Sequence, residues 1–284
     1  MSSSRDTQPV HLAVAQRPAE MMTSVGEKAL GSIAEIGRVF LFFFTVVRAA
    51  TRRPIRLTLA LLQAEFVGVG SLFIVTLTGT FTGAVFTLQS IQALEQVGME
   101  SMVGSTVLLA VSRELAPVLT SLMVTGRVAS AMATELGTMR VTEQIDAMEV
   151  MAVDPVGYLV VPRVVASAAM VPMLTMIFTG VAFIGAYIVA VGTMGIDEGA
   201  FVSRIEWFLD PYDFMHGIYK AFVFGIVLAL IGCYKGYHAA GGARGVGEAT
   251  TKAVVIGSIT IFVLDYVLTT VLLQLEPAYT DVSY

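Results

Sequence analysis

Charged side chains are scarce in this sequence of 284 residues. Asp, Glu, Lys and Arg make up only 14% of it, whereas hydrophobic residues make up 56%. Soluble domains contain about 25% charged residues, and the mean hydropathy here is +0.78. The composition therefore excludes an ordinary soluble domain and indicates an integral membrane protein.

Cysteine and histidine are also scarce. The single cysteine, Cys233, excludes an internal disulfide and a zinc site built from cysteines. The three histidines lie in the N-terminal tail and at the two ends of one apolar run, at His11, His216 and His238. Scattered histidines of this kind are more typical of membrane interfaces than of metal sites. We expect neither a metal site nor a cofactor bound by this chain.

A complete phosphate-binding loop is missing as well. The stretch GGARGVGEA places Gly242 and Gly247 at the glycine pair of the motif G-x-x-x-x-G-K-[ST]. Glu248 and Ala249 then stand where the motif requires Lys and Ser or Thr. A glycine-rich cytoplasmic turn is the better interpretation, because glycine lets backbones approach closely. The sequence thus predicts a chain that is not itself an enzyme.

Long apolar runs are abundant. Crossing a hydrocarbon core takes roughly 20 helical residues. Five runs reach that length, at residues 66–94, 101–126, 164–196, 214–234 and 253–275. Pro117 and Pro172 fall inside two of them, and neighbouring helices can absorb the resulting kinks. The sequence therefore predicts an all-α membrane protein with five transmembrane helices.

The N-terminal part of the chain differs from these runs. Residues 1–25 are polar and lack the apolar centre of a secretory signal, so we expect a flexible tail. In residues 26–65, the run VFLFFFTVV is too short to span and precedes four arginines, Arg48, Arg52, Arg53 and Arg56. Such a segment is typical of an interfacial helix whose arginines contact anionic headgroups. A sixth, membrane-embedded helix fits the same pattern.

The distribution of Lys and Arg predicts the orientation. With the N-terminus in the cytoplasm, the cytoplasmic segments hold fourteen Lys and Arg, and the outer segments hold only Arg204. This asymmetry is the expected positive-inside pattern. It places residues 135–154 in the cytoplasm and the C-terminal tail, residues 276–284, in the periplasm.

The cytoplasmic stretch 135–154 has two chemically different sides. Apolar side chains recur at helical spacing on one side, and acidic side chains occupy the other. The apolar set is Val141, Ile145, Met148 and Ala152, and the acidic set is Glu143, Asp146 and Glu149. This pattern predicts an amphipathic helix along the membrane surface. Anionic lipid would repel its acidic face, which suits a protein partner better, although a solvated helix without a partner also fits.

Four segments carry a family resemblance. They are GRVASAMATELGTMRVTEQIDAMEVMAVDPVGYLVVPRVVA at residues 126–166, SRELAPVLTSLMVTGR from Ser112, GGARGVGEATTKAVV from Gly241, and LDYVLTTVLL from Leu264. Together they resemble the MlaE permease family, the membrane subunits of ABC transporters that work with mammalian-cell-entry (MCE) lipid-binding proteins. The resemblance covers roughly residues 30–275, with residues 66–275 as the permease domain.

The resemblance implies a homodimer in the bacterial inner membrane. Its expected partners are a dimer of cytoplasmic ATPases that bind ATP and Mg, a periplasmic MCE hexamer, and a small cytoplasmic accessory subunit, with no nucleic acid. Such complexes move phospholipids between the inner membrane and the outer envelope and help to maintain outer-membrane lipid asymmetry. The family's cytoplasmic coupling helix matches residues 135–154, and its candidate contacts here are Glu135, Gly137, Thr138, Met139, Arg140, Glu143 and Asp146.

Charges inside the apolar runs are the candidate substrate-pathway residues. They are Arg113, Glu114, Lys220 and Asp265. Each charge costs about 2.5–3.5 kcal/mol at a helix centre, so it normally faces a partner charge or a wet cavity. These residues therefore either pair between helices and hold the bundle, or line a lipid pathway. On the second interpretation, we expect Arg113 and Lys220 to attract an anionic headgroup, tuned by Glu114 and Asp265.

Two other functional classes fit parts of the sequence. A secondary transporter would bind its substrate at the membrane midplane and often has internal repeats, which this sequence does not show. A structural anchor for an MCE assembly would not need charges within its spans. The pair Gly79-x-x-x-Gly83 fits a close helix contact, including a dimer seam, but a lone motif of this kind also arises by chance.

Overall fold

The computed structural model describes residues 34–35, 37–51 and 56–275, and the tails expected at 1–25 and 276–284 lie outside these ranges. Five of the described helices are long and apolar enough to cross a membrane. They span Leu57–Glu95, Glu100–Val141, Val156–Thr193, Pro211–Tyr237 and Gly242–Leu275. The described residues form helices and no strands. The predicted all-α membrane fold is therefore confirmed.

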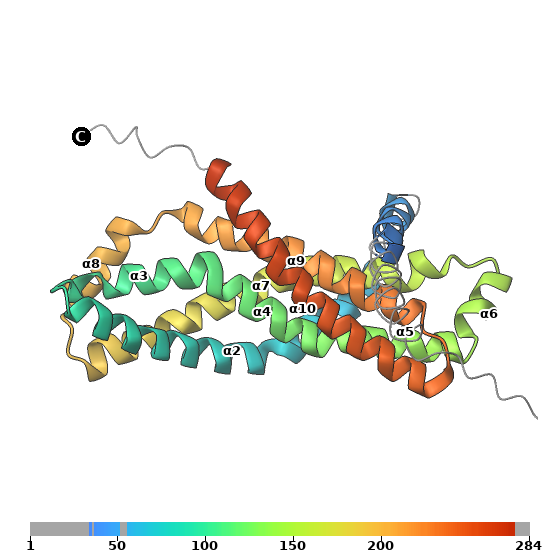
Figure 1. Cartoon of the computed structure of the whole chain (residues 1–284), viewed down its shortest axis with the longest axis horizontal. Helices are drawn as coiled ribbons and strands as arrows, with labels where there is room; N and C mark the ends of the chain where they lie inside the picture. The colour runs from blue at the N-terminus through green and yellow to red at the C-terminus, as the bar shows by residue number, and fades with distance from the viewer. Residues whose placement is uncertain (1–33, 36, 52–55, 276–284) are drawn as a thin grey trace, which may run out of the picture.

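Each long helix consists of one or more labelled elements. The first is α2 (Leu57–Glu95), and the fourth and fifth are α9 (Pro211–Tyr237) and α10 (Gly242–Leu275). The second runs through η1 (Glu100–Met102), α3 (Val103–Ala110), η2 (Val111–Leu115), α4 (Ala116–Val124), η3 (Thr125–Ala129) and α5 (Ser130–Val141). The third runs through η4 (Val156–Val160), α7 (Val161–Tyr187) and η5 (Ile188–Thr193). Two short helices, α6 (Gln144–Val150) and α8 (Glu198–Phe208), lie at opposite ends of the molecule (Figure 1).

The helices are longer than the apolar runs that predict them. Hydropathy falls at the first charged residue, but the hydrogen bonds of the helix continue through it. The second long helix thus extends past residue 126 to Val141, and Arg127 lies inside it rather than in the predicted loop. Likewise, α2 begins at Leu57, so the predicted boundary at residue 65 falls within that helix.

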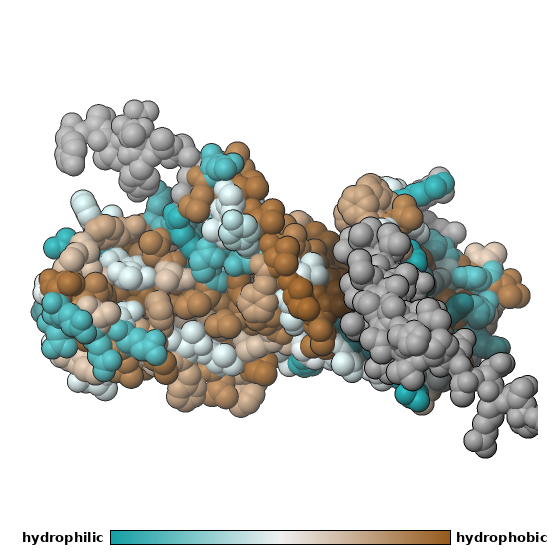
Figure 2. Space-filling model, viewed as in Figure 1, coloured by the Kyte–Doolittle hydropathy of each residue, from teal (hydrophilic) through white to brown (hydrophobic). Residues whose placement is uncertain are grey.

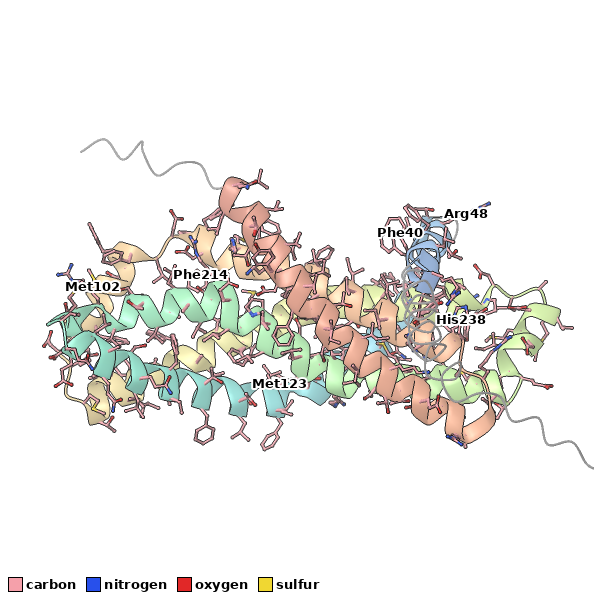
Figure 3. The ribbon with its side chains drawn as sticks, in the orientation of Figure 1. Phe40, Arg48, Met102, Met123, Phe214 and His238 are labelled. Atoms are coloured by element: carbon pink, nitrogen blue, oxygen red, sulfur yellow. The ribbon has the colours of Figure 1, made fainter. Side chains whose placement is uncertain are left out.

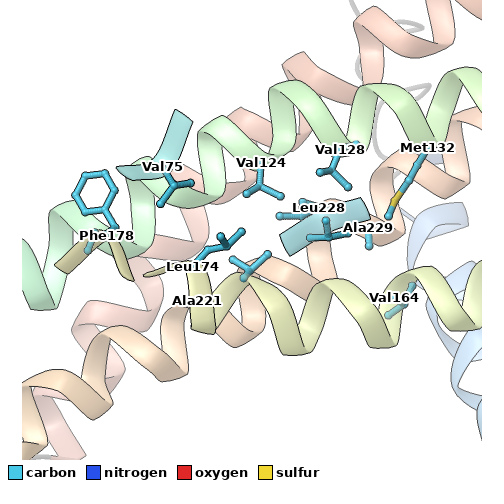
Figure 4. Close-up of a cluster of buried hydrophobic side chains, with 14 of the residues drawn as sticks. Val75, Val124, Val128, Met132, Val164, Leu174, Phe178, Ala221, Leu228 and Ala229 are labelled. Carbon is cyan, nitrogen blue, oxygen red and sulfur yellow. The ribbon is translucent and has the colours of Figure 1, made fainter. Parts of the chain in front are cut away.

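Close packing of α2 against α7 depends on small residues. A side-chain carbon at Gly83 would lie 2.0 Å from the carbonyl oxygen of Ala182, and one at Gly185 would lie 2.2 Å from that of Thr80. Gly79 likewise lies against Phe178. The Gly79-x-x-x-Gly83 pair therefore serves a contact within one chain, which argues against its use as a dimer seam. Beside this contact, α7, α9 and the second long helix enclose an apolar core (Figure 4).

The helix of residues 37–51 lies across the long axis of the bundle (Figure 1). It does not run with the five long helices, which follow the length of the bundle (Figure 1). Phe42 is buried, with its ring centroid 5.5 Å from that of Tyr234, whereas Phe40 and Phe44 are exposed (Figure 3). We therefore interpret this crosswise helix as interfacial. Arg52 and Arg53 lie outside the described residues.

Surface hydropathy agrees with this placement. In Figure 2, hydrophobic surface dominates the middle of the molecule, and hydrophilic residues gather at its two ends and in one patch beside the C-terminal end of α10. The end of α5 and the whole of α6 lie beyond the crosswise helix (Figure 1). This end of the molecule therefore projects out of the apolar layer.

An ion pair fixes the start of the crosswise helix. Glu35 accepts a hydrogen bond from Lys235 near the end of α9, and this bond lowers the pKa of Glu35 from its ordinary value of 4.5. Because the folded pKa is lowered, the pair contributes to docking above the unfolded pKa. That contribution is lost as the pH falls through the folded value.

Replacing Glu35 with Gln should loosen the crosswise helix at neutral pH. We expect faster amide hydrogen exchange in residues 37–51 of E35Q, measured by mass spectrometry and corrected for intrinsic rates. Wild-type exchange should approach that of E35Q only as the pH falls through the lowered pKa of Glu35, where the carboxylate becomes protonated. Glu95→Gln, at an exposed site in α2, is the matched control. Equal exchange in E35Q and wild type at pH 7 would contradict the assignment.

Candidate functional site

Two charged clusters, each with one buried member, lie between the second long helix and α9. In the first, Arg113 contacts Asp213, with 2.5 Å between Nη2 and Oδ1 and 2.6 Å between Nε and Oδ1. The other carboxylate oxygen of Asp213 accepts the backbone N–H of Asp210 at 2.9 Å, within the capping box that begins α9. Asp213 thus satisfies a helix end and neutralises an intramembrane arginine together.

The second cluster surrounds Lys220. Its Nζ lies 2.5 Å from Glu114 Oε2, 3.0 Å from Asp265 Oδ1 and 2.7 Å from Thr269 Oγ1. An ammonium group has three N–H donors, and three oxygen partners lie within contact distance here. The partners come from η2 and α10, while Lys220 belongs to α9. One buried cation therefore ties three helices together.

Exposure differs sharply within the Lys220 cluster. The Lys220 side chain is 0% exposed, whereas that of Glu114 is 40% exposed and that of Asp265 is 21% exposed. The open side of the cluster is consequently acidic, and the cation lies behind it. The expected attraction of a headgroup by Lys220 stays a prediction, but it would require the carboxylates to move first.

The structure brings all four predicted pathway residues to this region and adds two that the sequence analysis missed. Asp213 falls in a predicted outer loop, although a Pro-x-Asp start is a recognisable signal for a helix N-terminus. Thr269 lies one helical turn after Asp265, the spacing at which side chains share a helix face. That spacing was the available signal. Each of the four charges therefore pairs with another helix: Arg113 with Asp213, and Lys220 with Glu114 and Asp265.

Residues 135–154 do not form one amphipathic helix, so that prediction was wrong. The chain bends at Glu143, which has a left-handed φ of 59°, and again at Ala152, also at 59°. Non-glycine residues in this region cost roughly 1–2 kcal/mol, so surrounding contacts must hold both bends. The result is α5 and α6 joined at an angle, with α6 beyond the crosswise helix (Figure 1).

Most of the candidate coupling residues have partners within the chain. Glu135 contacts Arg163 at 2.8 Å, and Arg140 forms an ion pair with Asp146. Three others stabilise α5 itself or its packing: Gly137 lies against Ala239 and Val246, Thr138 donates to the carbonyl of Thr134, and Met139 is half-buried. Only Glu143, at the bend, is exposed without a side-chain contact among the described residues.

The tip of α6 is apolar rather than acidic. Val150 is 89% exposed and Met151 is 66% exposed, whereas Ile145 is fully buried. The sequence analysis missed this pair because it placed the apolar side of the segment on the membrane. Beyond the crosswise helix, such exposed apolar residues are typical of a contact with another protein.

The sequence similarity to known proteins extends over the same five long helices. The model of the family described as Permease MlaE matches residues 60–271. A probable ABC transporter permease protein of Rickettsia felis is 41% identical over 87% of this chain and 95% of its own length. The intermembrane phospholipid transport system permease protein MlaE of Haemophilus influenzae is 32% identical, over 88% and 97%. The chloroplastic protein Trigalactosyldiacylglycerol 1 of Arabidopsis thaliana is 40% identical, over 75% and 61%.

Removing the cation of the Lys220 cluster should destabilise the protein. Lys220→Met leaves two carboxylates without their counter-charge, and breaking a buried pair in this way costs about 3–5 kcal/mol. We expect K220M to lose its folded peak at a lower temperature in detergent, measured by size-exclusion chromatography after heating. Adding Glu114→Gln and Asp265→Asn should recover most of the loss. A K220M protein as stable as wild type would refute the pairing.

Proposed function

This chain belongs to the MlaE permease family, and we propose on that premise that it exchanges phospholipid between the inner membrane and a periplasmic MCE protein. The observation that carries the proposal is the family match across all five long helices. It is joined by the relative from Haemophilus influenzae, whose name states phospholipid transport. We infer that this chain is the non-hydrolytic subunit and that a partner ATPase binds ATP and Mg. Its proposed role is to help maintain outer-membrane lipid asymmetry.

The ATPase contact is proposed on α6. Val150 and Met151 lie at its end and Glu143 at its start, and all three side chains are exposed. An apolar pair at one end and an acidic residue at the other suit a partner surface with an apolar pocket and a separate basic group. The ion pair between Arg140 and Asp146 holds α6 against the end of α5, so a push on the tip reaches α5 directly.

The second long helix is suited to carry that motion into the membrane. It is helical from Glu100 to Val141, and about 27 residues separate Glu114 from Val141, a distance of ~40 Å at 1.5 Å per residue. In the part of this helix that is distant from Val141, Glu114 contacts Lys220. Movement of α5 would therefore change the contacts that hold α9 and α10 together. We propose this rearrangement as the link between ATP hydrolysis and lipid movement.

A second copy is proposed against α10. This helix is buried along only 11% of its most apolar window, against 56% for α9. Its outward side chains include Ile259, Phe262 and Tyr266, which are 58%, 57% and 76% exposed. The partly exposed carboxylate of Asp265 belongs to this helix, and that of Glu114 shares its contact with Lys220. In a homodimer paired through α10, the Lys220 cluster of each copy would border the cavity between the copies. A lipid would pass through this cavity.

A charge at the α6 tip should weaken ATPase binding. Val150→Asp places a carboxylate in the proposed apolar contact, and central contacts of this kind contribute about 2 kcal/mol or more. We expect roughly 30-fold less ATPase to co-purify with V150D. Glu143→Lys should act in the same direction. Trp207→Asp, at a comparably exposed apolar site in α8, is the matched control. Unchanged co-purification in V150D and E143K would place the contact elsewhere.

Transport itself tests the function. The tagged chain is reconstituted with its co-purified ATPase and MCE protein, and transfer of labelled phospholipid between vesicles and the MCE protein is followed with and without ATP. Glu114→Gln should slow ATP-dependent transfer by roughly 2- to 30-fold, the range for residues along a coupling network, while the complex still assembles. Phospholipid transfer at the same rate with and without ATP would favour a secondary transporter. A wild-type complex that assembles but transfers nothing would favour an anchor.

A further inference from the structure

Arg127 occupies a slot between η3 and α2. Its Nη1 donates to the carbonyl oxygen of Phe66 at 2.9 Å and to Ser71 Oγ at 3.1 Å, and its guanidinium lies 4.8 Å from the centroid of the Phe66 ring. A side-chain carbon at Gly70 would lie 2.1 Å from Nη2. The absence of that carbon creates the slot, so α2 is shaped to admit this arginine.

Among the described residues, no carboxylate lies at ion-pair distance from Arg127. Eight Lys and Arg residues lie in the five long helices, and seven of them lie at ion-pair distance from a carboxylate. Within the described part of the chain, Arg127 is the exception. A carbonyl and a hydroxyl accept its hydrogen bonds but supply no negative charge, and an uncompensated cation is costly in an apolar layer.

The depth of Arg127 places it near the cytoplasmic headgroups. Two residues further along the helix, Ala129 lies against Gly232 of α9, where an added side-chain carbon would be 2.9 Å from its carbonyl oxygen. Two residues beyond Gly232, Tyr234 holds the crosswise helix through Phe42. Arg127 thus lies about four residues, or ~6 Å, inside the level of the interfacial helix.

The surface around Arg127 is open. On one side of it α2 packs on α7, and on the other α10 packs on α9 and α5. Between them, Gly126 is exposed, with open space where a side-chain carbon would lie, and Met123 and Arg127 are partly exposed (Figure 3). Towards the cytoplasm, Ser130 and Thr134 continue this line at helical spacing. A lipid headgroup could therefore reach the guanidinium from the cytoplasmic leaflet.

We propose that Arg127 binds the phosphate of a phospholipid taken from the cytoplasmic leaflet, between α2 and α10. A guanidinium has five N–H donors, and the contacts to Phe66 and Ser71 use those of Nη1. Nε and Nη2 carry the other three N–H donors, and bonds from a guanidinium to phosphate oxygens are charge-assisted. The inference deepens the proposed function and rests on it for the nature of the cargo. The Lys220 cluster, which is acidic on its open side, is a separate site.

A photo-crosslinker next to Arg127 tests the proposal. p-Benzoylphenylalanine is placed at Gly126, and at Gly180 of α7 as the control, because both glycines are exposed with open space around them. Purified protein in vesicles receives trace radiolabelled phospholipid or radiolabelled diacylglycerol, which lacks phosphate. We expect residue 126 to label phospholipid at least ~10-fold more than diacylglycerol, as suits a charge-assisted contact. Residue 180 should label both about equally.

Arginine variants complete the test. Arg127→Gln should abolish the preference at residue 126 and leave labelling at 180 unchanged, whereas Arg127→Lys should retain part of it. Equal labelling of both lipids at residue 126 in the wild-type background would overturn the proposal, even if R127Q fails to fold. Loss of phospholipid labelling in excess inorganic phosphate would instead assign a soluble anion to the site. The assay needs no ATPase, so failure of ATP-dependent transfer with preserved labelling would refute the proposed function alone.

Discussion

The ammonium group of Lys220, fully buried in an apolar bundle, is the constraint on which the rest of the structure depends. A cation at this depth is tolerable only while oxygens surround it, and its oxygens come from two other helices. The packing of α9, α10 and the second long helix therefore cannot change without changing these contacts. Because its contacts are already occupied, the cluster is poorly suited to bind a lipid headgroup. It is better suited to couple the positions of the three helices.

The ion pairs of the bundle lie at different depths along α9. The Arg113–Asp213 pair lies near the start of α9, the Lys220 cluster follows two turns later, and Lys235 binds the crosswise helix near the end. One helix, α9, thus bears a cation-dependent contact at each level. It is also the most buried of the five long helices. This position suits a fixed central helix around which α10 and the second long helix rearrange.

The sequence predicted the five spans, their all-α fold and the four intramembrane charges, because hydropathy and the cost of buried charge are local properties. It did not predict the partners, because Asp213 and Glu35 meet their cations across 100 and 200 residues of chain. The bends at Glu143 and Ala152 were missed for a related reason: tertiary contacts hold a backbone conformation that neither residue favours. Arg127 was expected in a loop because hydropathy cannot distinguish a charged helix interior from a helix end.

The crosswise helix has a further consequence for how the protein fits its bilayer. It marks the level of one membrane interface, and α2 begins close to that level and continues for 39 residues, almost 60 Å by helical rise. A hydrocarbon core is only ~30 Å thick, and a tilt of about 20° shortens the helix by a few ångströms. The excess must emerge on the opposite side. Under the proposed function, a lipid that leaves on this side would meet the end of α2 above the bilayer surface before it met water.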